Sequence, residues 1–408
     1  MENGEQLELD IDKIVFPGRG LSRTGGCVVF VPGVVHGERV RARVSKKKKN
    51  YAEAVLDEVI DASEYRIEPA CPINSKCPGC CYQHVSYEAE VDIKRKQFIN
   101  FIEHNAGMCA PADVGAVPSP SFTGYRNRIT LHVAEDSNGP YVGYIGYDNR
   151  SIIDVPACPL ACPEINELLC SLRSDRDFME SLPRDGTLML RYSPGSGAYF
   201  LVKDKKHKRD IRAGVSLNYA REDTVIGTVK VPPGGFFQVN AAVMNMLLEY
   251  VLDAIGDVRP LSFIDVYCGS GLFAIAAASA GVSNVLGIES DAACVKAARE
   301  NCREKGLENV TFLADAAGDV LGAALDCVEL ENTMALVDPT RRGLEKPVRE
   351  ALVSRRPQRI MYVSCAPDTM ARDLKELAGA GYKIERARLF DMFPRTPYFE
   401  SVVMLSMS

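Results

Sequence analysis

Short apolar runs alternate with stretches of helical length from about residue 232 to the end of the chain. The runs that predict strands are "LSFIDVY", "NVLGIES", "NVTFLAD", "TMALVDP" and "RIMYVSC". The stretches that predict helices are "FFQVNAAVMNMLLEYVLDAI", an Ala-rich segment ending at Ala280, "DAACVKAARENCREKG", residues 344–355 and a segment after Pro367. This alternation is typical of a doubly wound parallel α/β sheet. The last two runs, "KIERARLFDMF" and "YFESVVMLSM", have no helix between them, so we expect them to pair antiparallel at the sheet edge.

The first 62 residues show a different pattern. Short β-prone runs such as "CVVFVPGVV", "ERVRARV" and "YAEAVLDEVI" are separated by Gly and Pro without helical periodicity, which predicts a small closed β-barrel. In "RVRARV", Arg39, Arg41 and Arg43 should share one face of a strand while the residues between them face the core.

Residues 63–231 form a predicted central domain, which leaves 232–408 as the α/β domain. The central segment opens with clustered cysteines and continues with hairpin signals at "SNGP" and "SPGSG". A basic cluster, "KDKKHKRDIR" at 203–212, is interpreted as a solvated loop, with an additional RNA-binding surface as the alternative.

Composition and charge narrow the class of protein. A chain of 408 residues with 46% hydrophobic and 25% charged residues is typical of a globular protein of two or three domains. No leader or membrane-spanning run is visible, so we expect a cytoplasmic protein without a membrane partner. The net charge is -6, yet residues 13–51 hold ten Lys or Arg against one acid, Glu38. Such a segment suits a phosphate backbone; the alternative is a solvated edge strand whose charges prevent aggregation.

The loop "DVYCGSGLF" places Gly269 and Gly271 between a strand and a helix, where a parallel sheet admits a ligand. Glu289 closes the next strand and can accept hydrogen bonds from ribose hydroxyls, and Asp315 ends the third. The loop lacks the third glycine of a dinucleotide fingerprint and the Lys-Ser/Thr of a P-loop. Because carboxylates, including Asp265, surround it, the pattern favours the cationic cofactor S-adenosylmethionine.

A thiol and a carboxylate are predicted at the same edge. In "YVSCAP", Cys365 follows the fifth strand, as Asp338 follows the fourth. A buried cysteine is most often an apolar filler, but beside a methyl donor it can activate a carbon such as uracil C5 by adding to C6. Glu400, which begins the final strand, is the candidate base for the C5 proton; its alternative is an edge-strand charge.

Five motifs together resemble the RNA uracil-5 methyltransferase family over essentially the whole chain: "FFQVN", "DVYCGSGLF", "DPTRRG", "VSCAPDTMARD" and "FPRTPYFES". The N-terminal region resembles the RNA-binding TRAM barrel of the ribosomal-RNA members. The resemblance implies that Cys365 is the nucleophile and Glu400 the base. It also implies a set of cofactor-pocket residues: Gln238, Tyr267, Leu272, Glu289, Asp315 and Asp338. The chain departs from the family at Ala366, at Tyr398 and in the loop "PTRRG".

The cysteine cluster "CPINSKCPGCC" supplies Cys71, Cys77 and Cys80. The family pattern of three clustered cysteines and one distant one implies Cys158 as the fourth ligand. By spacing alone four thiolates bind zinc or a [4Fe-4S] cluster; the resemblance favours the cluster, in a structural or RNA-positioning role. The rival cysteines Cys81 and Cys162 are interpreted as structural.

The sequence therefore predicts an enzyme that methylates C5 of a uridine in structured RNA, with 23S ribosomal RNA favoured and a monomeric state expected. We expect the Cys365 thiolate to be partly activated by its electrostatic setting. Two alternatives stay open: a transfer-RNA methyltransferase with the same chemistry, and a non-catalytic RNA-binding or assembly protein that keeps the fold.

Overall fold

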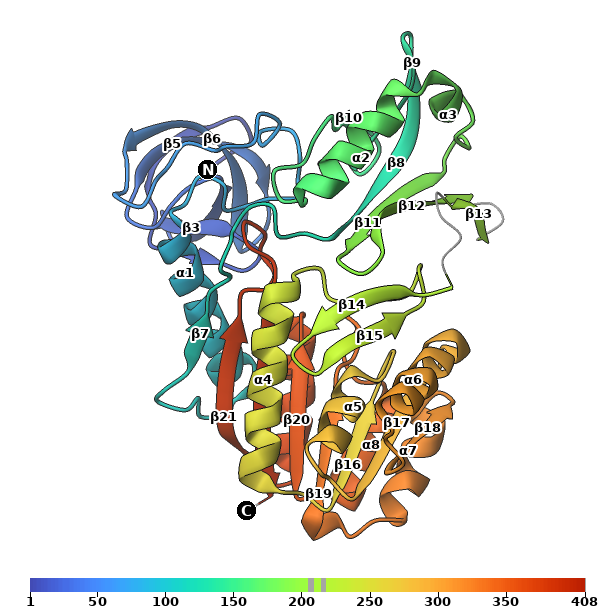
Figure 1. The fold of residues 1–408 in the computed structure, drawn as a ribbon. Helices are drawn as coiled ribbons and strands as arrows, with labels where there is room; N and C mark the ends of the chain where they lie inside the picture. The colour runs from blue at the N-terminus through green and yellow to red at the C-terminus, as the bar shows by residue number, and fades with distance from the viewer. Residues whose placement is uncertain (205–208, 214–217, 408) are drawn as a thin grey trace.

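The computed structural model describes residues 1–204, 209–213 and 218–407. Figure 1 shows three units: a strand-rich N-terminal unit, a central sheet, and a C-terminal α/β unit. Among the described residues, no helix has the length and apolar character needed to cross a membrane.

The N-terminal unit is a six-stranded sheet of order β1-β5-β6-β4-β3-β2. Its strands are β1 (Gln6–Asp10), β2 (Lys13–Val15), β3 (Arg19–Thr24), β4 (Cys27–Pro32), β5 (Arg39–Lys47) and β6 (Tyr51–Asp61). The two end strands, β1 and β2, are joined only by Ile11 and Asp12, and the Asp12 N–H donates to the Leu21 carbonyl at 2.9 Å. The sheet therefore curls back on itself, as the predicted small barrel requires.

The central unit is a second six-stranded sheet, of order β10-β9-β8-β11-β12-β13. It comprises β8 (Arg128–Asp136), β9 (Gly139–Ile145), β10 (Ile152–Asp154), α2 (Pro163–Ser174), α3 (Arg176–Glu180), β11 (Thr187–Ser193), β12 (Gly197–Asp204) and β13 (Arg209–Ala213). Both predicted hairpins are confirmed, since β8 pairs with β9 around "SNGP" and β11 with β12 around "SPGSG". In the basic cluster at 203–212, residues 203–204 end β12 and residues 209–212 belong to β13, so these residues form paired strands and not the predicted loop. Residues 205–208 lie outside the described residues, and the RNA-binding alternative stays a prediction.

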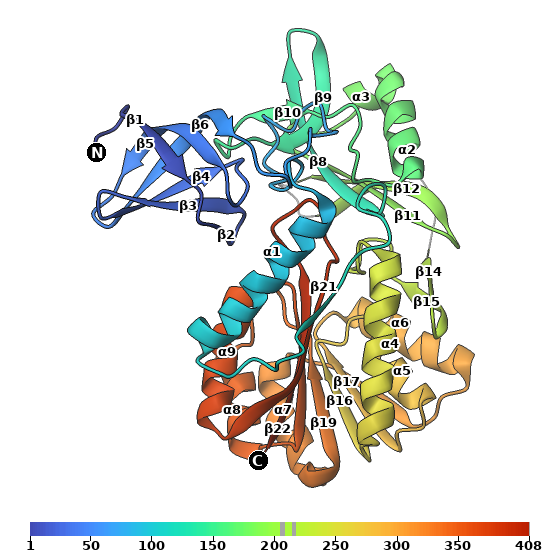
Figure 2. The ribbon, with the colours of Figure 1, turned by 90° about the vertical axis from the view of Figure 1, so that its left-hand side faces the viewer.

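Two segments connect the N-terminal and central units to the C-terminal unit. A helix, α1 (Tyr87–Asn100), continues into the π-helical turn η1 (Phe101–Ala106), and Figure 2 shows them between the barrel and α9. The hairpin of β14 (Ala220–Thr224) and β15 (Gly227–Val231) precedes the C-terminal unit. The sequence patterns did not indicate α1, because its apolar residues follow no strong helical stripe.

The C-terminal unit is an eight-stranded sheet of order β18-β17-β16-β19-β20-β22-β21-β7. Its strands are β7 (Gly115–Val117), β16 (Ser262–Val266), β17 (Asn284–Glu289), β18 (Val310–Ala314), β19 (Thr333–Val337), β20 (Arg359–Ser364), β21 (Tyr382–Phe390) and β22 (Glu400–Met407). Its helices are α4 (Ala241–Val258), α5 (Leu272–Ser279), α6 (Ala292–Lys305), α7 (Ala317–Asp326), η2 (Leu330–Asn332), α8 (Lys346–Arg355) and α9 (Pro367–Gly379). Strands β16 to β20 are parallel, so the doubly wound sheet is confirmed.

Three details differ from the sequence-based expectation. The last two strands do pair antiparallel, but β7 pairs with β21 and forms the edge in its place. Helix α4 begins only at Ala241, because the Asn240 side chain accepts a hydrogen bond from the Val243 N–H and caps it. Helix α7 was not anticipated. The boundaries at residues 62 and 231 stay a prediction.

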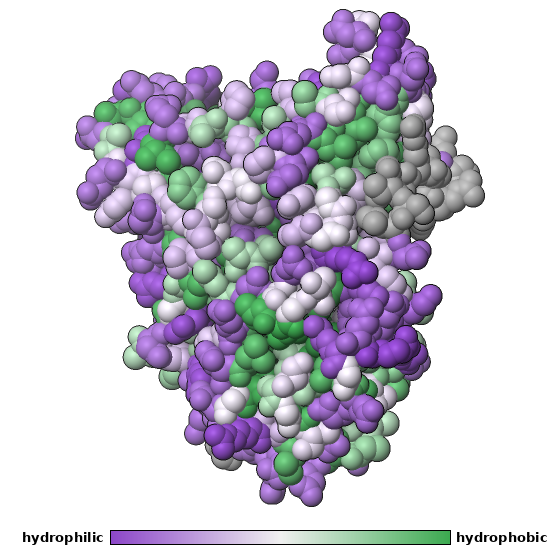
Figure 3. Space-filling view, in the orientation of Figure 1, coloured by the Kyte–Doolittle hydropathy of each residue, from purple (hydrophilic) through white to green (hydrophobic). Residues whose placement is uncertain are grey.

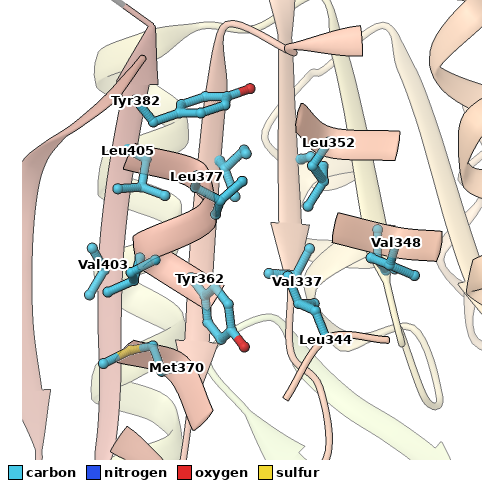
Figure 4. Packing of buried hydrophobic residues seen from close by; sticks show 14 of the residues in the cluster. Val337, Leu344, Val348, Leu352, Tyr362, Met370, Leu377, Tyr382, Val403 and Leu405 are labelled. Atoms are coloured by element: carbon cyan, nitrogen blue, oxygen red, sulfur yellow. The ribbon is translucent and has the colours of Figure 1, made fainter. Parts of the chain in front are cut away.

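Apolar side chains pack both faces of the C-terminal sheet. Figure 4 shows one cluster, in which Tyr362 and Val403 of neighbouring strands meet Leu352 of α8 and Leu377 of α9. The other face is covered by α4 and α5. In Figure 3 a patch of apolar residues lies over α4, while polar residues cover most of the surrounding surface. This two-sided core holds the carboxyl ends of the parallel strands in fixed relative positions.

A buried charge network, which we call the junction network, joins α1 to the loop between β21 and β22. Lys94 Nζ lies 2.7 Å from Glu90 Oε1 and 2.7 Å from Asp391 Oδ1. Arg395 Nη1 lies 3.3 Å from Glu90 Oε2 and donates to the Val85 carbonyl at 2.6 Å. Each charged group has a partner of opposite charge, so the network links the units without leaving a buried charge unpaired.

Candidate active site

The C-terminal sheet brings most of the predicted site residues to one edge. The carboxyl ends of the five parallel strands and the first residue of antiparallel β22 lie there, and the strand order reverses between β16 and β19. In spatial order from β18 to β22 the edge carries Asp315, Glu289, Tyr267, Asp338, Cys365 and Glu400. Open parallel sheets bind ligands at such a switch point.

The loop from Tyr267 to Gly271 forms the centre of this edge. Tyr267, Gly269 and Gly271 have left-handed φ angles of 67°, 53° and 84°. A Cβ on Gly271 would lie 3.0 Å from the Phe312 ring, so only glycine fits between the loop and the sheet. The Gly269 N–H donates to Glu289 Oε2 at 3.1 Å, which fixes the acid beside the loop.

The segment 236–240 lies beside the start of α5. Phe237 packs with two valines of β15 in a small apolar cluster that Leu272 also contacts. The Gln238 side chain is buried, and its backbone carbonyl accepts a hydrogen bond from Asn127 Nδ2 at 3.2 Å. Gln238 and Leu272 are therefore brought close to the glycine loop, and the central unit helps to hold them there.

Buried carboxyl groups stand behind the loop without full hydrogen bonding. Asp265 Oδ2 accepts from the Ala274 N–H at 2.8 Å, but Oδ1 has no partner among the described residues. Burial raises the pKa of Asp265 to about 8, and nearby Asp338 and Glu289 add to the rise. Burial also raises the pKa of Asp338 to about 7. A nearby cation stabilises the ionised form of buried carboxyl groups whose pKa is raised, so this edge favours a cationic ligand.

Cys365 and Glu400 face each other across β20 and β22. The antiparallel register ends with Ser364 paired to Ser401, so Cys365 and Glu400 are the next residue on each side, and the charge of Glu400 raises the pKa of the Cys365 thiol after the larger effect of burial. Glu400 is buried, and its Oε1 has no hydrogen-bond partner in the described part of the chain. Burial raises the pKa of Glu400 well above its ordinary value, and Asp338 raises it further. The sheet thus presents a thiol and an unpartnered carboxyl group side by side.

The structure does not give Cys365 the lowered pKa expected from the sequence. Burial raises the pKa of the Cys365 thiol to about 12, and Glu400 and Asp338 contribute to the rise. The Arg341 guanidinium opposes this shift through its charge and a hydrogen bond. The expectation of an activated thiolate is therefore wrong for the protein alone, because burial, with two carboxyl groups adding to it, outweighs the effect of one guanidinium.

Arg341 is a site residue that the sequence reasoning missed. Its guanidinium carbon lies 4.0 Å from the centre of the Tyr398 ring, and its charge lowers the pKa of both Cys365 and Glu400. Its carbonyl accepts a hydrogen bond from Thr369 Oγ1 at 3.2 Å, so α9 holds the loop. The motif "DPTRRG" contains two consecutive arginines, and no signal in it shows which one faces the thiol.

A cavity of about 450 Å³ opens between the central unit and the loops of the C-terminal unit. Arg341 and Tyr398 line it on one side, and Arg126 and Arg128 on the other. Phe236, with 67% of its surface exposed, also lines the cavity. Cations and aromatic rings therefore surround a space that reaches the residues beside Cys365.

The four cysteines predicted as metal ligands lie at the same cavity: Cys71, Cys77, Cys80 and Cys158. The charge of Cys158 contributes to raising the pKa of each of the other three thiols, behind the larger effect of burial. Within the described ranges, no three Cys, His, Asp or Glu side chains are arranged to hold a metal ion. The structure gathers the four thiols but does not confirm an iron-sulfur cluster.

The two rival cysteines lie in packed surroundings. A Cβ on Gly18 would lie 2.6 Å from Cys81 Sγ, so this thiol is pressed against the barrel. Cys162 belongs to the apolar core of the central unit, together with Ile165 and Leu169. Both positions fit the structural role predicted for these residues.

The arginine stripe on the barrel is paired with acids. Arg39, Arg41 and Arg43 do share one face of β5, as predicted. Ion pairs connect this face to neighbouring strands: Arg39 and Arg41 with Glu8, Arg41 also with Glu58, and Arg43 with Asp57. Because β5 lies between β1 and β6, the edge-strand alternative is wrong. The contact of the stripe with a phosphate backbone stays a prediction.

The fold is that of class I methyltransferases with an N-terminal TRAM domain. A solved structure of this shape, the Pyrococcus abyssi tRNA (uracil-54, C5)-methyltransferase in complex with S-adenosyl-L-homocysteine, matches with a TM-score of 0.72 and 24% identity, over 98% of this chain and 100% of that one. Family models match a TRAM domain at residues 1–56 and a tRNA (uracil-5-)-methyltransferase at residues 223–408.

The chain belongs to the RNA uracil-5 methyltransferase family. A Nostoc protein described as an uncharacterized RNA methyltransferase is 31% identical over 99% of this chain and 97% of its own length. An Aquifex aeolicus protein with the same description is 30% identical over 98% of both chains. The family predicted from the five motifs is confirmed.

Proposed function

We propose that this protein methylates C5 of a uridine in structured RNA with S-adenosylmethionine, through a covalent adduct between Cys365 and uracil C6. The observation that carries the proposal is that Cys365 and Glu400 directly adjoin the last β20–β22 pair, Ser364 with Ser401, at the ligand-binding edge of the sheet. Glu400 Oε1 is buried there without a hydrogen-bond partner among the described residues. A thiol beside a base that can remove a proton is what this reaction requires.

The carboxyl groups of the sheet edge fit a cationic cofactor. Asp265 Oδ1 is buried without a partner, and Asp265 and Asp338 have raised pKa values. Residues suited to hold the cofactor are Gln238, Tyr267, Leu272, Glu289, Asp315 and Asp338. When bound, S-adenosylmethionine supplies an electrophilic methyl group, and its positive charge lowers the pKa values of the surrounding acids and thiol.

Cys365 and Glu400 then act in sequence. The thiolate adds to C6 and forms a carbon–sulfur bond, which leaves the ring as an enolate whose C5 accepts the methyl group. Glu400 removes the proton from C5, and the carbon–sulfur bond breaks to release the product and the thiolate. The Cys365 thiol releases its proton to solvent before it adds to C6, so Glu400 stays ionised and can accept the C5 proton. Arg341 offsets part of the negative charge of both groups.

RNA contacts are proposed at two places. In the cavity, Arg126 and Arg128 can meet phosphates, and the exposed ring of Phe236 can stack on an unstacked base. On the barrel, the hairpin tip Lys46–Lys49 carries exposed lysines, and for Lys46, Lys48 and Lys49 the described residues supply no ion-pair partner. We place the phosphate contacts of the barrel at this tip and not on the arginine stripe.

The four thiols at the cavity are the proposed ligands of a [4Fe-4S] cluster: Cys71, Cys77, Cys80 and Cys158. Their convergence on one cavity supports the donor set. Methyl transfer needs no redox step, so the cluster would supply a fixed shape at the wall of the RNA site. Strictly anaerobic purification tests this proposal: a brown protein with broad visible absorption supports it, and a colourless protein with stoichiometric zinc contradicts it.

Trapping on 5-fluorouridine RNA tests the reaction. Fluorine at C5 cannot leave as a proton, so the adduct should accumulate and run as a protein–RNA band on a denaturing gel. We favour ribosomal RNA because of the TRAM barrel; transfer RNA is the second candidate, because a solved neighbour acts on it. Labelled transcripts of both decide between them. No adduct on any RNA, with RNA binding intact, would contradict the proposed chemistry and favour a non-catalytic binding protein.

A further inference from the structure

The barrel makes a direct contact with the wall of the active site. Phe16 lies in the turn between β2 and β3. Its ring packs edge-on against Phe101 of η1, with 5.6 Å between the ring centres, and against Tyr398, with 6.1 Å between the centres. Tyr398 belongs to the loop that leads into β22, two residues before Glu400. A side chain of the RNA-binding domain therefore touches a loop that ends at the proposed base.

Tyr398 carries this contact on to the thiol. The Arg341 guanidinium lies over the Tyr398 ring at 4.0 Å, a distance at which the cation and the ring attract each other. The positive charge of the same guanidinium lowers the pKa of Cys365 against the larger effect of burial and so favours the ionised thiol. It also lowers the pKa of Glu400. Phe16, Tyr398 and Arg341 form a continuous series of contacts that ends at Cys365.

The turn that carries Phe16 has little freedom to move. Gly18, two residues further on, is packed so closely on Cys81 that a Cβ would lie 2.6 Å from its Sγ. The Cys81 N–H in turn donates to the Arg395 carbonyl at 3.0 Å, within the same loop as Tyr398. Phe16 thus approaches Tyr398 from a fixed position and can hold the ring in one place.

We propose that Phe16 is a positioning residue for the active site: by its contact with Tyr398 it keeps Arg341 in place over the Tyr398 ring, where its charge acts on Cys365. The barrel then has a second role besides binding RNA, since it maintains the electrostatic setting of the nucleophile. The role of Phe16 in catalysis rests on the proposed function. Its effect on the reactivity of the Cys365 thiol does not, because that reactivity can be measured without RNA.

The test is the rate at which iodoacetamide alkylates Cys365 as a function of pH, followed by mass spectrometry of the peptide that contains it. In Phe16→Ala the loss of Arg341 from its position should raise the pKa of the thiol. Well below the pKa, a rise of half a unit lowers the thiolate fraction, and with it the rate, about threefold. The matched control is Phe30→Ala, which removes another half-buried barrel phenylalanine that packs against Tyr51; it should leave the Cys365 rate unchanged.

Two further variants separate positioning from general destabilisation. Arg341→Gln should lower the rate at least as much as Phe16→Ala, and adding Phe16→Ala to it should cause no further loss, because the effect acts through Arg341. Tyr398→Phe keeps the ring and should behave like the unaltered protein. Equal losses in Phe16→Ala and Phe30→Ala, an unchanged rate in Phe16→Ala, or an additive double variant would overturn the inference. Absence of a trapped RNA adduct in the unaltered protein would instead overturn the proposed reaction and leave the alkylation result standing.

Discussion

The sheet edge and the junction network are both clusters of buried charge, but they differ in how the charges are paired. In the junction network, Lys94 lies within 2.7 Å of both Glu90 and Asp391. At the sheet edge, Asp265 and Glu400 each leave a buried oxygen without a partner in the described residues. The charged groups of the junction network are therefore all paired, whereas the sheet edge has carboxyl oxygens without a partner among the described residues.

This difference shows which cluster is built for a ligand. A buried charge without a partner destabilises the folded protein, so it is retained where a ligand or a reacting group completes it. Buried ion pairs with full hydrogen bonding need nothing more and serve to connect units. The same contrast holds on the barrel surface. The arginine stripe is paired with acids, whereas Lys46, Lys48 and Lys49 have no ion-pair partner within the described part of the chain.

The largest effect is expected at the sheet edge, on activity and not on stability. Glu400→Gln should form the RNA adduct but release it slowly, with turnover lowered about 10²- to 10⁴-fold. Because the folded pKa of Glu400 is raised, its ionisation costs stability as pH rises above about 4.5, so the Gln variant should be at least as stable at pH 8. Gel assays of adduct decay and urea unfolding measure the two effects. Normal turnover would show that Glu400 is not the base.

Cys365→Ala is the matched control for adduct formation. It should give no adduct at all, while binding RNA and unfolding in urea like the unaltered protein. An adduct that survives in this variant would show that a different residue, such as one of the other thirteen cysteines, is the nucleophile.

The junction network should behave in the opposite way. Lys94→Met leaves Glu90 and Asp391 buried without their shared cation, so the free energy of unfolding should fall by about 3–5 kcal/mol. The control is Lys96→Met on the same helix, because Lys96 pairs with Asp92 while 68% exposed and should contribute less than about 1 kcal/mol. Urea unfolding followed by fluorescence gives both values. Equal stability of the two variants would contradict the stabilising role of the junction network.

Much of the fold could be predicted from the sequence, because strands buried on both faces appear as short apolar runs and their order along the chain fixes the parallel sheet. The same reasoning placed Asp338 and Cys365 at one edge. It could not place β7 at the sheet edge, because this strand has only three residues, too few for a recognisable apolar pattern, and lies far in sequence from β21, with which it pairs. It also extended α4 too early, because "FFQVN" is apolar but serves the loop that leads to the Asn240 cap.

The sequence could not show which side chains from distant segments contact each other in the folded protein. Ten cations in residues 13–51 indicated a free basic surface, yet the acids that neutralise the arginine stripe lie outside that window, at Glu8, Asp57 and Glu58. The raised pKa of Cys365 likewise depends on neighbours from two other strands. Arg341 and Phe16 were missed for the same reason, because their contacts join distant segments.

Cofactor binding should depend on pH if the edge carboxyl groups await a cation. Their raised pKa values mean that the free protein holds protons near pH 6, and a sulfonium favours the ionised forms. Affinity for S-adenosylmethionine should therefore rise with pH from 6 to 8, up to about tenfold per group and pH unit, and level off above pH 8. S-adenosylhomocysteine lacks the sulfonium charge, so its affinity should change less. Calorimetric titrations at several pH values measure the ratio of the affinities for S-adenosylmethionine and S-adenosylhomocysteine. A ratio that stays constant with pH would contradict the role of the acids.

The smallest effect should separate the two cationic surfaces of the barrel. Replacing Lys46, Lys48 and Lys49 by Ser should weaken RNA binding and reduce the slope of log affinity against log salt by up to about 0.9 per lysine, since unpaired lysines release counterions when they meet phosphates. Replacing Arg39 and Arg43 by Gln is the matched control. Both arginines already have acidic partners, so their loss should leave the salt slope nearly unchanged. If the arginine variant instead loses the larger part of the slope, RNA displaces the acids, and pairing in the free protein does not identify the surface that binds.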